Sequence, residues 1–117
     1  MTTAAIVLMV GRGLLAALFL LAGLTKILQP KPVLDHMAAE HVPKIFFPAV
    51  IALELGAGAA LLTGWNAGWA AAVLSVFCLL TAIVFHRNFA ERAERTQFIK
   101  DIALAGGLAF VAASTMA

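Results

Sequence analysis

Residues 4–28 read AAIVLMVGRGLLAALFLLAGLTKIL, an apolar run that a single arginine, Arg12, interrupts in its first half. An α-helix rises about 1.5 Å per residue, so about 20 such residues cross the roughly 30 Å hydrocarbon core of a bilayer. Three further apolar stretches of similar length follow, at about residues 45–63, 67–85 and 97–115. The sequence therefore predicts an all-α integral membrane protein, a four-helix bundle that occupies residues 1–117 as one domain.

The composition agrees with lipid as the surrounding solvent. Hydrophobic residues make up 63% of the chain and charged residues 12%, whereas soluble domains average about half and about a quarter. The net charge of +2 is small and dispersed, so we expect no nucleic-acid partner. The single cysteine, Cys78, lies inside an apolar stretch, which predicts inert packing and no metal site. Because Arg12 interrupts the first stretch and no basic residue precedes it, we expect a retained span and not a secretory signal.

The connection between the first two spans carries a short amphipathic pattern at residues 33–42. Pro30 and Pro32 are expected to end the first span, because proline lacks the amide proton that a helix interior needs. At helical spacing the apolar side is Val33, Leu34, Met37 and Ala38, and the other side is mainly Asp35, His36, Glu40 and His41. We expect a short interfacial helix along the membrane surface, with a plain polar loop as the alternative.

Apart from Arg12, the basic residues flank only two of the three connections. Lys and Arg concentrate in the cytoplasmic loops of membrane proteins. Loops 29–44 and 86–96 are therefore predicted to be cytoplasmic, with both termini on the outer side. The residues behind this assignment are Lys26, Lys31, Lys44, Arg87, Arg92, Arg95 and Lys100.

Two ionisable residues lie well inside predicted spans, Arg12 in the first and Glu54 in the second. Either side chain would be costly if it faced lipid alone. Arg12 lies roughly 12 Å from the outer end of its span and Glu54 roughly 14 Å from the outer end of its own, at 1.5 Å per residue. Adjacent antiparallel helices would bring these depths level, which predicts a buried Arg12–Glu54 ion pair. The pair would either fix the helix register only or form the polar wall of an intramembrane pocket.

A second polar cluster is expected at the cytoplasmic ends of the spans. It consists of Lys26, His86, Lys100 and Asp101, which should lie near one depth. His86 has the chemistry to move protons or to bond a quinone oxygen near neutral pH, although a histidine at a helix end also commonly reaches to the headgroups. Lys100 is expected to anchor the interface, and Asp101 either to pair with it or to cap the first turn of span four.

Segments along nearly the whole chain resemble the DoxX family of small four-span membrane proteins. The resemblance rests on Arg12 followed by LLAALFLLAGLTKIL (14–28), the short helix ending in Val42 and Pro43, LELGAGAALLTGW with Glu54 (53–65), FHRNF (85–89) and QFIKDIALAGGLAF (97–110). One departure is Asp101, because the resemblance leads us to expect asparagine after the lysine of span four. A hydrogen-bonding role at that position therefore does not carry over directly.

The resemblance implies a bundle in a bacterial inner membrane and, as in some relatives, a membrane subunit of an oxidoreductase that passes electrons from sulfur compounds to quinone. The chain has no haem-ligand histidine pairs, cysteine cluster or nucleotide motif, so a redox cofactor would belong to a partner subunit or be a diffusible quinone. The quinone head group would meet Arg12, Glu54, His86 or Lys100. A scaffold or assembly protein is the first alternative. A small transporter is the second, and it would require a homo-oligomer because one four-helix chain has little room for a pore.

Overall fold

The computed structural model describes residues 2–86 and 90–116, and this part of the chain is helical apart from short connections. The helices are α1 (Thr3–Leu28), α2 (Lys31–Ala39), α3 (Phe46–Thr63), α4 (Ala67–Phe85) and α5 (Arg92–Met116). Thr2 caps α1, because its side chain accepts a hydrogen bond from the Ala5 amide at 3.1 Å. Gly64 caps the C-terminal end of α3, and its φ of 88° lies in the left-handed region that a residue without a side chain adopts easily.

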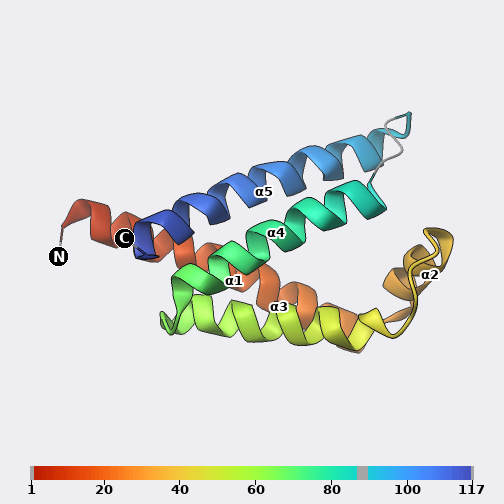
Figure 1. Ribbon diagram of the computed structural model, residues 1–117, viewed down its shortest axis with the longest axis horizontal. Coiled ribbons are helices and arrows are strands. Elements are labelled where there is room, and N and C mark those ends of the chain that lie inside the picture. Colours follow the sequence, from red (N-terminus) through yellow and green to blue (C-terminus); the bar gives the residue numbers. More distant parts are fainter. Residues whose placement is uncertain (1, 87–89, 117) are drawn as a thin grey trace.

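The four long helices form two antiparallel pairs that meet along α3 and α4 (Figure 1). α1 packs along α3 and α4 packs along α5, whereas α1 and α5 touch only briefly. The short helix α2, the last turn of α4 and the first turn of α5 lie at one end of the bundle, which we call the α2 end. The chain termini lie toward the opposite end, which we call the terminal end. The predicted all-α four-helix bundle with a short helix after the first span is confirmed.

The core lies among α1, α3, α4 and α5 and is built from small and branched side chains. Leu61, Leu74 and Leu108, one each from α3, α4 and α5, are fully buried. Buried alanines between them let the helix backbones approach closely, as expected where van der Waals contact holds helices together in lipid. Ser75 donates a hydrogen bond to the Ala105 carbonyl oxygen at 2.8 Å, which ties α4 to α5.

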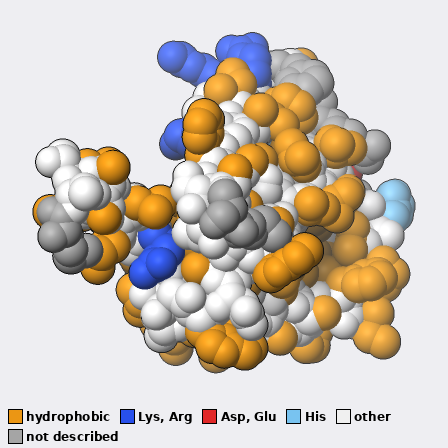
Figure 2. Space-filling view, turned by 60° about the vertical axis from the view of Figure 1, so that its left-hand side comes forward, with side chains coloured by type: hydrophobic (Ala, Val, Ile, Leu, Met, Phe, Trp, Pro, Cys, Tyr) orange, Lys and Arg blue, Asp and Glu red, His pale blue; other side chains and the backbone are white. Residues whose placement is uncertain are grey.

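The outer surface of the bundle is rich in exposed hydrophobic side chains. They are spread over the face shown in Figure 2, where Lys and Arg gather in only a few places. Leu14 of α1 is 69% exposed and Phe110 of α5 is 80% exposed. By length and composition, α1, α3, α4 and residues Arg92–Thr115 of α5 can each cross a membrane. Such a surface suits lipid and not water, so the chain is a multi-pass membrane protein.

The helix boundaries lie close to those of the predicted spans except at α5. That helix begins at Arg92, whereas the predicted span begins at residue 97. In its first turn the Arg95 amide donates to the Glu91 carbonyl oxygen at 3.0 Å. A polar turn can form these backbone hydrogen bonds as well as an apolar one, so the helix extends beyond its apolar part.

The short helix is also displaced from its predicted range of 33–42. It begins two residues earlier because Pro32 lies in its first turn, where a helix needs no amide donor. It ends at Ala39, and His41 then adopts a positive φ of 58° that is incompatible with a continuing helix.

Candidate functional site

A cavity of about 780 Å³ lies at the α2 end, and all five helices contribute to its lining. Its volume falls within the range of about 300–1,000 Å³ that is typical of small-ligand sites. Most of the wall is aromatic or aliphatic, with Phe19 of α1, Phe47 of α3 and Phe77 of α4 among its side chains. The acidic, lysine and histidine side chains that interrupt this wall are Lys26, His36, Glu54, His86 and Asp101.

Lys26 of α1 and Glu54 of α3 form an ion pair on the cavity wall. Lys26 Nζ lies 2.6 Å from Glu54 Oε1, and the two side chains are 17% and 5% exposed. At this distance the ammonium and the carboxylate are in direct contact, largely out of reach of water. A Cβ at Gly23 would lie 2.8 Å from the Leu55 side chain. The missing side chain at Gly23 thus lets α1 and α3 approach closely enough for the pair to form.

Glu54 pairs with Lys26 and not with Arg12, so the predicted Arg12–Glu54 ion pair is wrong. Leu20 faces Gly58 across the α1–α3 contact, and this register brings Glu54 level with α1 residues about 12 positions after Arg12, or about 18 Å away. The prediction sets the outer ends of the two spans at one level. In the structure the first residue of α1 lies well beyond the last residue of α3. Arg12 consequently packs against the turn at Gly64, where a Cβ would lie 3.4 Å from both terminal guanidinium nitrogens.

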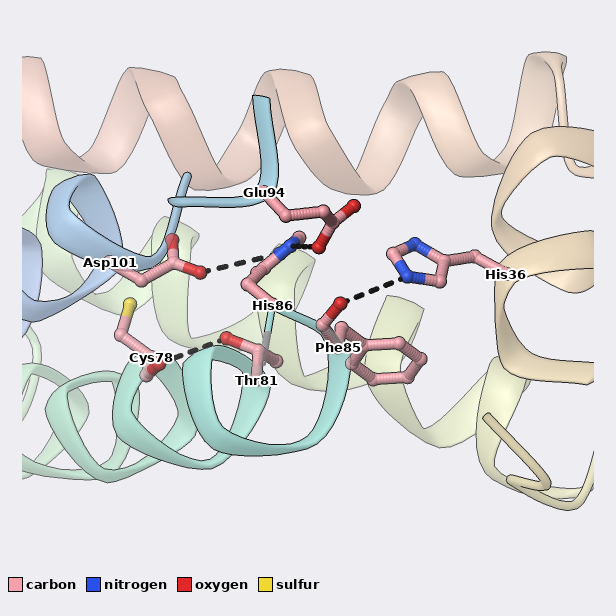
Figure 3. Close-up of polar contacts among 7 residues, drawn as sticks. All are labelled: His36, Cys78, Thr81, Phe85, His86, Glu94 and Asp101. Carbon is pink, nitrogen blue, oxygen red and sulfur yellow. Dashed lines mark hydrogen bonds and ion pairs between the residues drawn. The ribbon is translucent and has the colours of Figure 1, made fainter. Parts of the chain in front are cut away.

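The second polar group of the cavity is centred on His86, which follows the last turn of α4 (Figure 3). Its Nδ1 lies 2.9 Å from Glu94 Oε2, and its Nε2 lies 3.5 Å from Asp101 Oδ2. Glu94 and Asp101 are seven residues apart on α5, about two turns, so both carboxylates lie on the same helix face. An imidazole between two carboxylates can hold a proton on either nitrogen, or on both, and can pass one on.

His36 brings α2 into the same site. Its Nε2 lies 3.1 Å from the Phe85 carbonyl oxygen, and because a carbonyl oxygen only accepts, this nitrogen carries the proton (Figure 3). The contact satisfies one of the carbonyl groups that a helix leaves unpaired at its C-terminal end. The His36 ring also meets the rings of Phe85 and His86 edge-on, at centroid distances of 5.1 Å and 5.7 Å. α2 is thereby tied to the end of α4 beside the cavity.

The structure divides the four residues that were expected to form one polar cluster. His86 and Asp101 are in contact, while Lys26 lines the same cavity but pairs with Glu54. Lys100 is exposed and does not belong to the cavity lining. Successive helix residues point about 100° apart, so Lys100 and Asp101 cannot both face the cavity. Asp101 therefore contacts His86 instead of pairing with Lys100, and it lies well beyond the first turn of α5.

Two residues of this site, Glu94 and His36, are not predicted from the sequence. The pattern places Glu94 in a polar connection, although its seven-residue spacing from Asp101 identifies it once that stretch is treated as helical. The pattern places His36 on the polar side of the short helix. No spacing in the sequence indicates its contact with Phe85, which is 49 residues away.

The fold and the site together define a small multi-pass membrane protein, a four-helix bundle with an apolar cavity at one end and ion pairs on the cavity wall. The model of the DoxX family matches residues 7–87, and the chain belongs to the DoxX family. The matched range includes Lys26, Glu54 and His86, and it stops before the carboxylates of α5.

A similar protein supports this assignment. The chain is 38% identical over 104 residues to the inner membrane protein YqjF of Escherichia coli (strain K12), an alignment that covers 89% of this chain and 80% of that protein. No solved structure matches the chain. The likeness and the four apolar helices identify a multi-pass protein of the inner membrane.

Proposed function

We propose that this DoxX protein binds an isoprenoid quinone in the cavity at the α2 end and serves as the quinone-binding subunit of an inner-membrane oxidoreductase. The observation that carries the proposal is the cavity itself, which is about 780 Å³ in volume, mostly apolar and interrupted by a few ionisable side chains. A quinone has matching chemistry, since its tail is hydrocarbon and its ring bears two carbonyl oxygens that accept hydrogen bonds.

Lys26 and His86 are the side chains best suited to hold the ring oxygens. The Lys26 ammonium has three N–H donors, and its contact with Glu54 engages only part of this capacity. His86 reaches the cavity from another helix end, and its Nε2, whose contact with Asp101 is the longer one at 3.5 Å, would address the second ring oxygen. Hydrogen bonds from such donors would strengthen as the ring gains electrons and negative charge develops on its oxygens. Arg12 and Lys100 do not line this cavity and have no part in the proposal.

The His86 group supports a proton supply for this reaction. Reduction of a quinone to a quinol adds two electrons and two protons. Glu94 is the more exposed of the two carboxylates, with its side chain 23% exposed against 11% for Asp101. Protons would pass from the surface to Glu94, then to His86 and into the cavity. The electrons would come from a partner subunit, because the chain has a single cysteine and no haem or nucleotide motif of its own.

The proposal places the α2 end on the cytoplasmic side of the membrane. Lys31 of α2 and Arg92 of α5 belong to helix ends at this side of the bundle, and basic residues favour the cytoplasm. A cytoplasmic partner could then deliver electrons beside the cavity. A cysteine placed at Lys31 should react with a membrane-impermeant thiol reagent in inverted vesicles and not in intact spheroplasts, and the opposite labelling would reverse this orientation.

Binding of a short-tailed quinone to the purified protein in quinone-free detergent tests the proposed site. Ala22 lines the cavity, whereas Ala17 on the same helix is exposed on the outer surface. Ala22→Phe inserts a ring into the cavity, and we expect the dissociation constant to rise at least about ten-fold. Ala17→Phe adds the same ring outside and should change it by less than about two-fold. Equal weakening by both variants, or no saturable binding by the original protein, would contradict the proposal.

A further inference from the structure

A second cavity, of about 610 Å³, lies at the terminal end of the bundle and shares no residue with the proposed quinone site. Arg12 of α1, the turn between α3 and α4, the first residues of α4 and Thr115 of α5 line it. We propose that this cavity binds a phosphate group, with Arg12 as the cation, and that the phosphate belongs to the headgroup of an anionic phospholipid.

Arg12 is a partly buried cation for which the described residues provide no counter-charge. Its Nε is buried and has no hydrogen-bond partner within residues 2–86 and 90–116. Its guanidinium lies against the backbone at Gly64, where a Cβ would be 3.4 Å from both terminal nitrogens. An anion beside this partly buried guanidinium would offset the cost of moving its charge away from water. Its planar fork of five donors matches the oxygens of a phosphate group.

The first turn of α4 adds donors to the same cavity. Asn66 precedes this helix and makes no side-chain cap hydrogen bond, so the first amides of α4 receive no cap from it. Ala67, Gly68 and Trp69, the residues of that first turn, line the cavity together with Arg12. The partial positive charge of a helix N-terminus adds to that of the guanidinium. Two independent features of the chain thus favour an anion at one place.

The depth of the cavity favours a lipid as the source of the phosphate. Trp65 and Trp69 are 72% and 67% exposed, and they are the only two tryptophans of the chain. Indole rings gather at the headgroup level, and an irregular turn with a polar Asn66 has no place in hydrocarbon. The turn beside Arg12 therefore lies where lipid phosphates are found.

The two tryptophans allow this cavity to be probed by fluorescence in the full chain. We would reconstitute the protein in mixed vesicles in which either phosphatidylglycerol or phosphatidylcholine carries brominated acyl chains that quench tryptophan on contact. We expect the anionic lipid to be enriched about five-fold at the tryptophans, the effect of one well-placed cation near the surface. Arg12→Gln should reduce the enrichment to less than about two-fold. Lys44→Gln removes the same charge from the exposed connection before α3 and should leave it unchanged.

A second arm separates the lipid from free phosphate. Inorganic phosphate is added to vesicles of phosphatidylcholine alone, and a shift in tryptophan emission that Arg12→Gln abolishes would assign the cavity to free phosphate as the ligand. Arg12→Lys keeps the charge without the fork and should retain part of the enrichment if Arg12→Gln fails to fold. Equal quenching by both lipids together with no phosphate response in the original protein would overturn the proposal, as would full enrichment in folded Arg12→Gln. Quinone binding should not change in any of these variants, so the two proposed sites fail or succeed separately.

Discussion

The two ends of the bundle hold their buried charges in opposite ways. At the α2 end, Lys26 meets Glu54 and His86 lies against two carboxylates of α5, so each of these groups has a partner inside the chain. At the terminal end, Arg12 has a buried nitrogen without a partner in the described part of the chain. A pair can remain in a low-dielectric setting by itself, whereas a single cation depends on a group from outside. The contrast predicts that the paired charges matter for stability and Arg12 for binding.

Breaking the Lys26–Glu54 pair should have the largest effect on stability. Glu54→Leu leaves Lys26 mostly buried without a counter-charge, and we expect the free energy of unfolding to fall by about 3–5 kcal/mol. The double variant Lys26→Met/Glu54→Leu removes both charges and should lie within about 1 kcal/mol of the original protein. Unfolding in mixed micelles of a mild detergent and dodecyl sulfate measures both values.

The double variant also separates a ligand site from a scaffold. If the pair belongs to the quinone site, the folded double variant should bind quinone at least about ten-fold more weakly, a loss of about 1.4 kcal/mol. Undiminished binding, with the bundle intact, would show that the pair only holds α1 against α3.

Arg12→Met provides the matched comparison at the terminal end and should have a smaller effect. No ion pair of Arg12 is present among the described residues, so its removal should change the free energy of unfolding by less than about 1 kcal/mol in the same micelles. A loss as large as that of Glu54→Leu would mean that Arg12 has a stabilising partner inside the protein, and the contrast between the two ends would not hold.

The helices are predictable from the sequence because the thickness of the hydrocarbon core sets their length. Runs of apolar residues of that length indicate α1, α3 and α4 closely, and among the four long helices only the polar first turn of α5 escapes this criterion. The family resemblance can be recognised in the sequence as well, because most of the segments that carry it lie within these apolar helices.

The pairing of the charges is not predictable in the same way, because it depends on how far one helix slides past its neighbour. Arg12 and Glu54 are the two most conspicuous charges in the sequence, yet the α1–α3 register places Glu54 beside Lys26. That register depends on the close approach at Gly23, which residue counting from span ends does not contain. The contact of His36 with α4 likewise depends on where the short helix α2 packs, and the sequence pattern of α2 does not indicate which helix it contacts.

The central claim is that the ring of a quinone enters the α2 end of the bundle. An isoprenoid quinone with a photoreactive group on its ring, crosslinked to the reconstituted protein and mapped by mass spectrometry, tests this claim most directly. The account predicts crosslinks within residues 22–26 of α1 and 77–86 of α4, which excess unlabelled quinone should suppress. Crosslinks confined to residues 64–69 at the terminal end, or labelling that does not respond to the competitor, would contradict it.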